Sequence, residues 1–196
     1  MSFRIEQKIL INKNQSIDLK IFLKKRSANE IYPKRIVKSL YFENSTNQMF
    51  VDSEEGIVPR KKIRIRYYPE TESKFSIEKK ISSIEGRFKV NENIDKKLFD
   101  KYTQSGILDN QYGWCKPKIW VEYFREYFEI NDVRVTYDTD IKYLDTNGNL
   151  IGKEKNSVFE IKTSIKKNLD ELIIDFPYDR SRFSKYCNGI NLFYKN

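Results

Sequence analysis

Four basic residues occupy every second position of one short run, a spacing typical of a site for a polyanion. They are Arg60, Lys62, Arg64 and Arg66, and the alternate positions hold Ile63, Ile65 and Tyr67. Successive side chains of a β-strand point to opposite faces, so one face of this run is cationic and the other mostly apolar. Arginine clasps phosphate oxygens in a bidentate fashion, and lysine attracts them as a point charge. The run therefore predicts a strand with one cationic face, of a kind that can bind phosphate.

The same alternation recurs in four other segments, residues 3–11, 75–81, 133–138 and 158–163. This recurrence predicts a barrel whose strands turn their charged faces toward a common lumen. The predicted lumen residues are the cations Arg4, Lys8, Lys62, Arg64, Arg66, Lys80, Arg134 and Lys162 and the acids Glu6, Glu78 and Glu160.

So many cations need a compensating anion or bulk water. Two unit charges about 4 Å apart interact by roughly 4 kcal/mol at an effective dielectric near 20. A chain of phosphates is the fitting counter-ion. The acids, which recur as Glu-x-Lys, would repel phosphate unless a divalent cation bridges them, so Glu160, Glu6 and Glu78 are predicted to be metal ligands.

Other interpretations stay open at this point. The basic run could be a solvated edge strand or a stripe that contacts RNA. Each Glu-x-Lys taken alone is more typical of a surface ion pair, which contributes little to stability. Tyrosines such as Tyr41 and Tyr123 could stack on bases, although tyrosine on the outer face of a barrel strand is more often part of the core.

Composition narrows the class of protein. The chain has 196 residues, enough for one domain over residues 1–196. Its net charge of +9 favours polyanionic partners such as nucleotides, polyphosphate, nucleic acid or an acidic membrane surface. The sequence contains no histidine, which excludes serine-hydrolase and zinc-hydrolase schemes that need this side chain.

The sequence also predicts a cytoplasmic protein. No apolar run approaches the roughly 18 residues that cross a bilayer, and the first residues lead into a strand pattern rather than a signal peptide. Cys115 and Cys187 have no CxxC partner, so we expect two reduced, packed cysteines.

Several strands and few helices must position these residues, which predicts an α+β fold with an antiparallel sheet. Strands are predicted at residues 3–11, 36–43, 60–67, 74–82, 118–130, 133–138 and 158–163. A helix capped by Ser16 is predicted over residues 17–26, with Ile17, Ile21 and Phe22 on one face. Residues 91–106 are predicted to be helical, residues 49–56 a short helix or loop, and residues 170–177 and 180–188 a C-terminal end that includes a helix.

In this order the motifs resemble the VTC domain, the catalytic polyphosphate polymerase domain of the vacuolar transporter chaperone complex and its bacterial relatives. That domain has the triphosphate tunnel metalloenzyme fold. The resemblance covers nearly the whole chain through Arg4-x-Glu6-x-Lys8, Ser39-Leu40-Tyr41-Phe42-Glu43, Lys62-x-Arg64-x-Arg66-Tyr67, Glu78-x-Lys80, Tyr123-x-Arg125-Glu126, Arg134-x-Thr136-x-Asp138, Glu160-Ile161-Lys162 and Phe183-Ser184-Lys185-Tyr186.

The resemblance implies an antiparallel eight-stranded β-barrel tunnel with helices packed outside. It implies that phosphates are held by Lys8, Lys62, Arg64, Arg66, Lys80, Arg125, Arg134, Lys162 and Lys185, to which Arg4, Arg60 and Lys89 are added as further phosphate contacts. Glu160 would be the main ligand of Mn²⁺ or Mg²⁺, with Glu6 and Glu78 in support. The catalytic set would be Lys62, Arg64, Arg66, Lys80, Glu160 and Lys162.

The activity that the resemblance implies is transfer of the γ-phosphate of a nucleoside triphosphate onto a growing polyphosphate chain. No protein nucleophile is needed, because a terminal phosphate oxygen can attack directly. A triphosphatase that uses water as the acceptor is the second hypothesis. A non-catalytic module that binds polyphosphate or nucleic acid is the third, and nucleic acid is the less favoured ligand.

Overall fold

The computed structural model describes residues 4–71, 74–164 and 178–195. The strands are β1 (Arg4–Ile11), β2 (Asn29–Glu43), β3 (Arg60–Tyr67), β4 (Phe75–Ser83), β5 (Gly86–Ile94), β6 (Ile107–Asp109), β7 (Gly113–Ile130), β8 (Val133–Leu144), β9 (Leu150–Lys153) and β10 (Ser157–Ser164). The helices are α1 (Gln15–Lys25), α2 (Gln48–Glu55), α3 (Lys96–Ser105) and α5 (Lys185–Lys195). The predicted segment 170–177 lies outside the described residues, as does Phe3.

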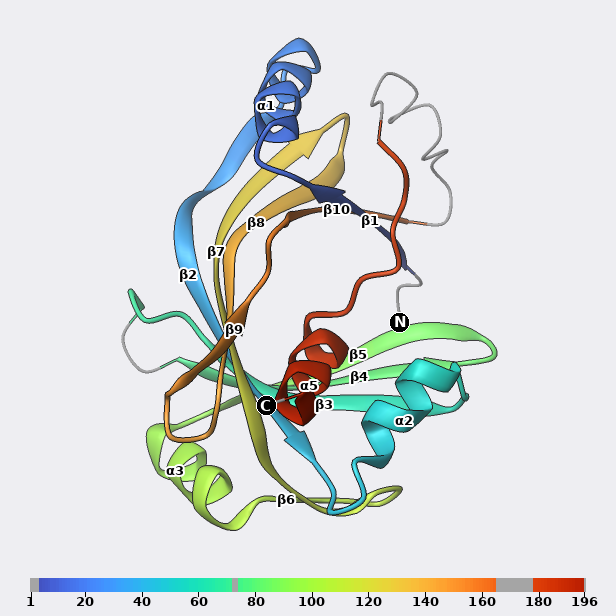
Figure 1. The fold of residues 1–196 in the computed structure, drawn as a ribbon, viewed down its shortest axis with the longest axis vertical. Helices are drawn as coiled ribbons and strands as arrows, with labels where there is room; N and C mark the ends of the chain where they lie inside the picture. Colours follow the sequence, from blue (N-terminus) through green and yellow to red (C-terminus); the bar gives the residue numbers. More distant parts are fainter. Residues whose placement is uncertain (1–3, 72–73, 165–177, 196) are drawn as a thin grey trace. The chain divides into compact units, whose positions relative to one another are not determined.

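Antiparallel pairing joins the strands into one sheet (Figure 1). In the described part of the chain its main path runs β1-β10-β8-β7-β2-β3-β4-β5, with β6 paired to β7 and β9 paired to β8. The path has eight strands, the number that the resemblance implies, and the predicted α+β class with an antiparallel sheet is confirmed.

The chain divides into two compact units. Unit 1 consists of Met1–Arg35, Tyr123–Ile141 and Glu154–Phe183. Unit 2 consists of Ile36–Glu122, Lys142–Lys153 and Ser184–Asn196. The chain passes from one unit to the other within β2, β7 and β8, so each of these strands contributes residues to both.

Unit 1 buries one face of its strands beneath α1. Leu19, Phe22 and Leu23 of α1 pack into a core that includes Ile9 of β1 and Phe159 of β10. This arrangement confirms the predicted alternation, because the odd-numbered residues of β1 and β10 enter the core and leave the even-numbered charged residues on the other face.

The helix predicted over residues 17–26 exists, but its predicted start is wrong, and of the three residues predicted on one face only Phe22 is buried. It begins at Gln15, where the backbone N–H of Asn12 donates to the side chain of Gln15 and the backbone N–H of Gln15 donates to the side chain of Asn12, both at 2.9 Å. This reciprocal pair, rather than Ser16, satisfies the first turn. Ile17 and Ile21 are 64% and 48% exposed. Leu19, Phe22 and Leu23 face the core instead.

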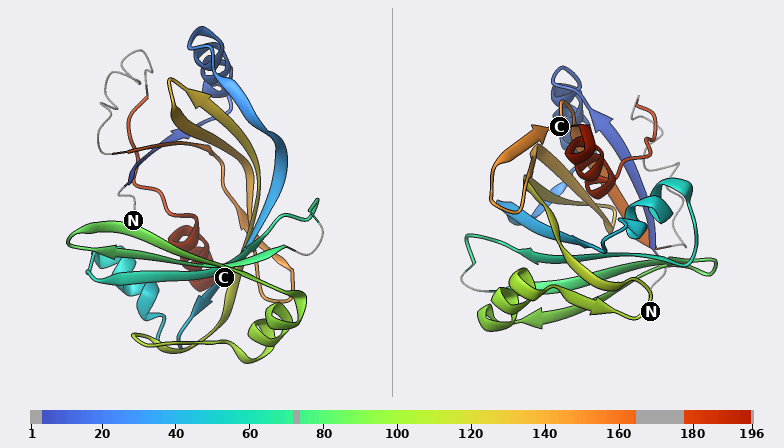
Figure 2. Two further views of the ribbon diagram at one scale, coloured as in Figure 1. Left: turned by 180° about the vertical axis from the view of Figure 1, so that it is seen from behind. Right: turned by 60° about the horizontal axis from the view of Figure 1, so that its bottom comes forward.

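Unit 2 places helices on both faces of its strands (Figure 2). On one face Phe99 of α3 stacks on Phe75 of β4, with ring centroids 4.2 Å apart. On the other, Tyr186 of α5 packs on Tyr41 of β2 with centroids 5.2 Å apart. A Cβ at Gly189 would lie 2.7 Å from the Tyr143 ring, so α5 approaches β8 closely only because this residue is glycine.

The prediction of a helix over residues 91–106 is wrong for its first part. Residues 91–94 complete β5, where they pair with residues 75–78 of β4. The side chain of Asp95 then accepts a hydrogen bond from the Leu98 backbone N–H at 2.7 Å and caps the helix that follows. In the described ranges, no helix is long and apolar enough to cross a membrane.

Candidate functional site

A row of three lysines crosses the basic face of unit 2. Lys62 of β3 lies opposite Lys80 of β4, which lies opposite Lys89 of β5. Neighbouring strands are about 4.8 Å apart, so the stems of these side chains start from adjacent points of the sheet. Ile63 and Ile65 are fully buried on the other face. Because a shift of one residue would expose them, their burial fixes the strand register and keeps the lysines together on one face.

Next to this row, the Glu78 carboxylate is surrounded by cations. Arg64 donates to its Oε2 from Nε at 2.7 Å and from Nη2 at 2.5 Å, and Lys89 donates to its Oε1 at 3.0 Å. Arg66 Nη1 lies 3.9 Å from Oε1. Burial alone would raise the pKa of Glu78, but Arg64, Arg66 and Lys89 outweigh it and hold the pKa well below its ordinary value. Glu78 is therefore ionised and orients the two arginines.

β2 supplies hydroxyl groups to the same arginines. Arg64 donates to the Tyr41 hydroxyl at 2.8 Å, and Arg66 donates to the Ser39 hydroxyl at 3.3 Å. Burial raises the pKa of Tyr41, but Arg64 and Arg66 together lower it below its usual range. Arg66 is only 8% exposed, so its guanidinium is held in a fixed position.

The N-terminal turn of α5 contacts Lys62. The ammonium group of Lys62 lies 3.1 Å from the Ser184 hydroxyl and 3.6 Å from the Cys187 sulfur. It also lies 5.2 Å from the centre of the Tyr186 ring, a cation–π distance. Lys185 is the first residue of this helix and is half-buried. These contacts place α5 on the charged face of unit 2.

Arg60, at the start of β3, binds a helix end. Its Nη1 donates to the carbonyl oxygens of Gly56 and Ile57 at 3.1 and 2.8 Å. Gly56 is the C-cap of α2, where a cation is favoured by the unsatisfied carbonyl groups.

Unit 1 contains a second charged cluster, centred on Arg125 of β7. Its Nε and Nη2 donate to the two oxygens of Asp138 at 2.5 and 2.6 Å, and Nη2 lies 3.6 Å from Glu160. Arg125 and Asp138 are 6% and 0% exposed. Burial would lower the pKa of Arg125, but the Asp138 carboxylate, with Tyr123 and Glu160, raises it well above its ordinary value. This is a buried bidentate ion pair.

β1 and β10 add four charged residues to this cluster. Lys162 lies 3.2 Å from the Glu160 carboxylate. Glu6 pairs in register with Lys162, and Lys8 with Glu160. The Lys8 ammonium donates to the Phe183 carbonyl at 2.8 Å. Burial lowers the pKa of Lys162, although Glu160 opposes this shift.

The remaining predicted residues of unit 1 lie at the margin. Arg134 of β8 pairs in register with Lys162 and is exposed. Arg4 begins β1, and its side chain lies outside the described part of the structure. Unit 1 therefore holds Arg4, Glu6, Lys8, Arg125, Arg134, Glu160 and Lys162, and unit 2 holds Arg60, Lys62, Arg64, Arg66, Glu78, Lys80, Lys89 and Lys185. Whether all of them share one cavity stays a prediction.

An orphaned oxygen beside Glu160 fits a divalent cation. Thr136 lies opposite Glu160 on β8, is fully buried, and its hydroxyl has no hydrogen-bond partner among the described residues. No group of three or more Cys, Asp and Glu side chains in the described ranges could hold a metal by itself. Glu160 and Thr136 are register partners, and Glu6 lies on the neighbouring strand β1, so this face carries oxygen donors of the kind that Mg²⁺ or Mn²⁺ prefers, with phosphate or water to supply the further ligands.

Three residues of these clusters stand in the predicted motifs but received no role in the predicted site. Asp138 and Thr136 occupy alternate positions of β8, on the face that carries Arg134, so the two-residue spacing could have assigned them to the charged face. The sequence favours a stacking or core role for Tyr41. Its hydrogen bond to Arg64 depends on the pairing of β2 with β3, which the sequence does not specify.

The family model of the VTC domain matches residues 3–194. The chain belongs to the VTC domain family. This match bears out the resemblance inferred from the order of the motifs. The comparison with curated protein sequences gave no match.

Solved structures of low sequence identity share the fold of this VTC domain. A candidate adenylate cyclase from Bacillus halodurans aligns with a TM-score of 0.67 at 15% identity, covering 93% of this chain and 94% of that one. A candidate adenylyl cyclase from Hippeastrum, for which a dominant triphosphatase activity is reported, has a TM-score of 0.65 at 15% identity over 97% and 96% of the two chains. A protein from Pyrococcus horikoshii has a TM-score of 0.64 at 14% identity over 96% and 99%. The VTC domain thus has the triphosphate tunnel fold.

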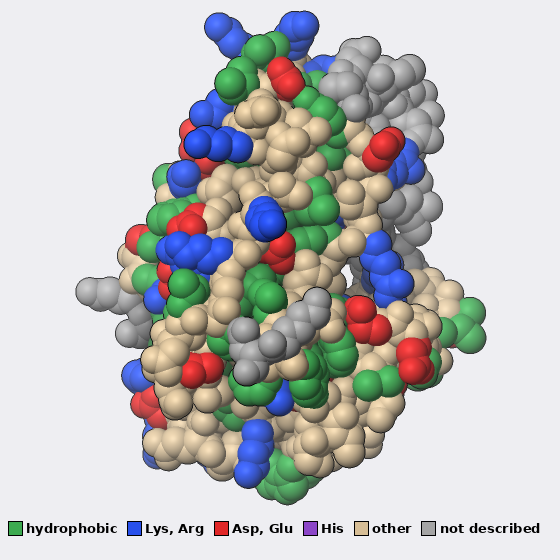
Figure 3. Space-filling view, viewed as in Figure 1, with side chains coloured by type: hydrophobic (Ala, Val, Ile, Leu, Met, Phe, Trp, Pro, Cys, Tyr) green, Lys and Arg blue, Asp and Glu red, His purple; other side chains and the backbone are tan. Residues whose placement is uncertain are grey.

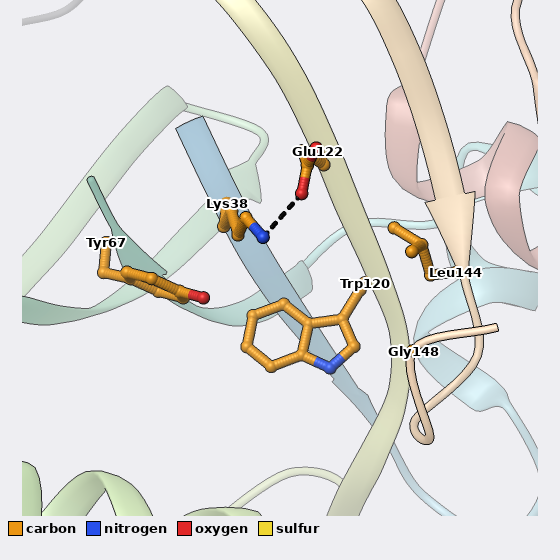
Figure 4. A pocket seen from close by; sticks show the side chains of 6 residues that line it. All are labelled: Lys38, Tyr67, Trp120, Glu122, Leu144 and Gly148. Carbon is orange, nitrogen blue, oxygen red and sulfur yellow. Dashed lines mark ion pairs between the residues drawn. The ribbon is translucent and has the colours of Figure 1, made fainter. Parts of the chain in front are cut away.

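A pocket of about 200 Å³ lies in unit 2 of the VTC domain (Figure 4). Its wall includes Lys38, Tyr67, Trp120, Glu122 and Leu144. Lys38 of β2 and Tyr67 of β3 are register partners. Lys38 donates to Glu122 at 2.7 Å, and Tyr67 is on the face of β3 opposite to Arg64 and Arg66. The pocket is therefore separate from the phosphate-binding candidates.

Glu43 of the VTC domain is a buried acid at the end of β2. It is 3% exposed, its Oε2 accepts from the Asn44 backbone N–H at 3.2 Å, and no described residue hydrogen-bonds its Oε1. Burial raises the pKa of Glu43 to about 7, against the opposing effect of backbone N–H groups at the start of α2.

We expect this acid to make the protein less stable as the pH rises from 4.5, its ordinary pKa, to about 7. In that window the unfolded chain loses a proton that the folded chain keeps, so the free energy of unfolding falls, by up to about 3 kcal/mol. Glu43→Gln should remove this part of the pH dependence and should stabilise the protein above pH 7. Urea denaturation of both proteins across this range measures the difference. An unchanged slope in the variant would contradict the assignment.

Proposed function

We propose that this VTC domain is a metal-dependent phosphoryltransferase that binds triphosphate or polyphosphate and synthesises polyphosphate from a nucleoside triphosphate. The observation that carries the proposal is the basic face of unit 2, where the row of Lys62, Lys80 and Lys89 lies beside Arg64 and Arg66. Phosphate oxygens would supply the anionic charge that these groups attract, and Glu78 would keep the arginines oriented for bidentate contacts.

In the proposed reaction a terminal phosphate oxygen of the acceptor chain forms a bond to the γ-phosphorus. The bond between the β–γ bridging oxygen and that phosphorus breaks, and the nucleoside diphosphate leaves. Charge neutralisation and positioning supply most of the rate in such reactions. A divalent cation, when bound, would neutralise phosphate charge further. Glu160 and Glu6, with the Thr136 hydroxyl, would hold it.

Hydrolysis of triphosphate is the second candidate function. The structurally similar Hippeastrum protein is described by its dominant triphosphatase activity, and the two reactions differ only in whether water or phosphate is the acceptor. Incubation with ATP and Mn²⁺ or Mg²⁺, followed by separation of polymer from free phosphate, distinguishes the two. If neither ATP, GTP nor inorganic triphosphate is turned over, both enzyme hypotheses fail and a non-catalytic binding module becomes the favoured function.

Ligand binding has its own test, which does not require turnover. We expect triphosphate and polyphosphate to raise the melting temperature in the absence of metal, because a ligand that binds only the folded state stabilises it by mass action. Orthophosphate should raise it much less, since it spans fewer basic groups. Thermal shifts measured at matched ionic strength, with sulfate as the control, provide the comparison. Equal shifts for all four anions would indicate nonspecific screening.

A further inference from the structure

The outer face of α1 exposes two large aliphatic side chains. Ile17 and Ile21 are 64% and 48% exposed, and residues four apart are neighbours on the surface of a helix. The opposite face of α1 is already buried through Leu19, Phe22 and Leu23. The isoleucines therefore form a compact apolar patch, here called the α1 patch, on the helix that covers the core of unit 1.

Basic residues surround the α1 patch. Residues 13–26 contain five basic residues, Lys13, Lys20, Lys24, Lys25 and Arg26, and one acid, Asp18. The four lysines are exposed. Asp18 accepts a hydrogen bond from the Tyr178 hydroxyl at 2.5 Å. Figure 3 shows Lys or Arg side chains and hydrophobic side chains side by side over α1, at the top of the view.

This combination fits an anionic lipid surface better than other polyanions. Lysine ammonium groups attract the anionic headgroups of a bilayer, and apolar side chains between them can enter the boundary with the acyl chains. The phosphates of nucleic acid would also contact the lysines, but its bases stack on aromatic side chains and would gain little from contact with isoleucine.

We propose that the α1 patch docks the protein reversibly on a bilayer that contains anionic lipid. In this position Ile17 and Ile21 enter the interface while Lys20 and Lys24 contact headgroups. Helix α1 has 11 residues and would lie in the plane of the interface rather than cross it. The proposal concerns a surface of unit 1 formed by α1 and stands independently of the proposed phosphoryl transfer.

Vesicle co-sedimentation of the whole chain tests this proposal. The probes are phosphatidylcholine vesicles with and without phosphatidylglycerol, at low and at physiological ionic strength. The wild type should bind the mixed vesicles and not the neutral ones. The double variant Ile17→Ser/Ile21→Ser should weaken binding about tenfold, and Lys20→Gln/Lys24→Gln by about tenfold or more, since each loses one of the two attractions.

Matched controls separate the α1 patch from general effects of charge and apolarity. Lys116→Gln/Lys153→Gln removes two exposed lysines of unit 2, and Ile84→Ser removes an isoleucine that is 90% exposed. Both should bind like the wild type. An equal loss for the lysine control would show that net charge alone drives binding. Unchanged binding of Ile17→Ser/Ile21→Ser, or equal binding to neutral vesicles, would overturn the proposal.

A second readout reports where the helix lies. Ile21→Cys carrying an environment-sensitive fluorophore should shift its emission to the blue on mixed vesicles, whereas the same label at Ile84→Cys should not. Both native cysteines are buried, so labelling can be directed to the new site. If RNA binds in a manner that depends on Lys20 and Lys24 and displaces the protein from vesicles without any shift at residue 21, α1 is a nucleic-acid contact and the membrane proposal fails.

Discussion

Glu160→Gln should reduce metal-dependent turnover by at least about 100-fold, which corresponds to about 2.7 kcal/mol of transition-state stabilisation. The substitution keeps the size of the side chain and removes the charge proposed to hold the cation beside Thr136 and Glu6. Triphosphate binding without metal should be unchanged or tighter, because a carboxylate next to an anion weakens its binding. Steady-state kinetics with Mn²⁺ or Mg²⁺ and a metal-free binding isotherm measure the two effects separately.

Two comparisons make that result specific. Glu129→Gln, a change at an exposed acid on β7, should retain full activity. Arg66→Ala should weaken metal-free triphosphate binding itself, because it removes a buried guanidinium that Ser39 and Glu78 hold in place. Full activity of Glu160→Gln would leave the fold unaffected but would contradict the metal assignment. Equal losses of metal-free binding in Glu160→Gln and Arg66→Ala would suggest that both act by disturbing the structure.

The sequence could predict the strands because their two faces differ chemically. In β3, Ile63 and Ile65 are buried and the basic residues occupy the other face. Burial of one face is enough to produce a period of two, whatever the strand pairs with. The order of several such motifs then identified the family, although each motif alone is weak.

Features that depend on tertiary packing could not be predicted in this way. Ile17 and Ile21 satisfy the helical period as well as Leu19 and Phe22 do, and only the position of the core decides which pair is buried. The partners of Arg64 and Lys62 likewise follow from strand pairing and from the docking of α5. Charge count alone assigns these cations to phosphate and overlooks the protein groups that orient them.

The buried pair of Arg125 and Asp138 should be the most sensitive point of unit 1. Asp138→Asn leaves a buried guanidinium without its bidentate carboxylate and with the Glu160 carboxylate 3.6 Å away. We expect a loss of about 3 kcal/mol in the free energy of unfolding, the lower end of the range for a buried ion pair broken from one side, because Glu160 compensates part of the remaining charge. Urea denaturation at neutral pH measures this loss.

Removing both charges should cost much less than removing one. In Arg125→Met/Asp138→Leu, apolar side chains of similar size replace the pair, and such replacements are often neutral or stabilising. The same variant separates stability from function: if Arg125 binds phosphate, the double variant should fold but lose affinity for triphosphate. If instead it folds and binds normally, Arg125 serves only to position Asp138 and Glu160. A double variant as unstable as Asp138→Asn would mean that packing around β7 and β8, rather than charge, explains the sensitivity.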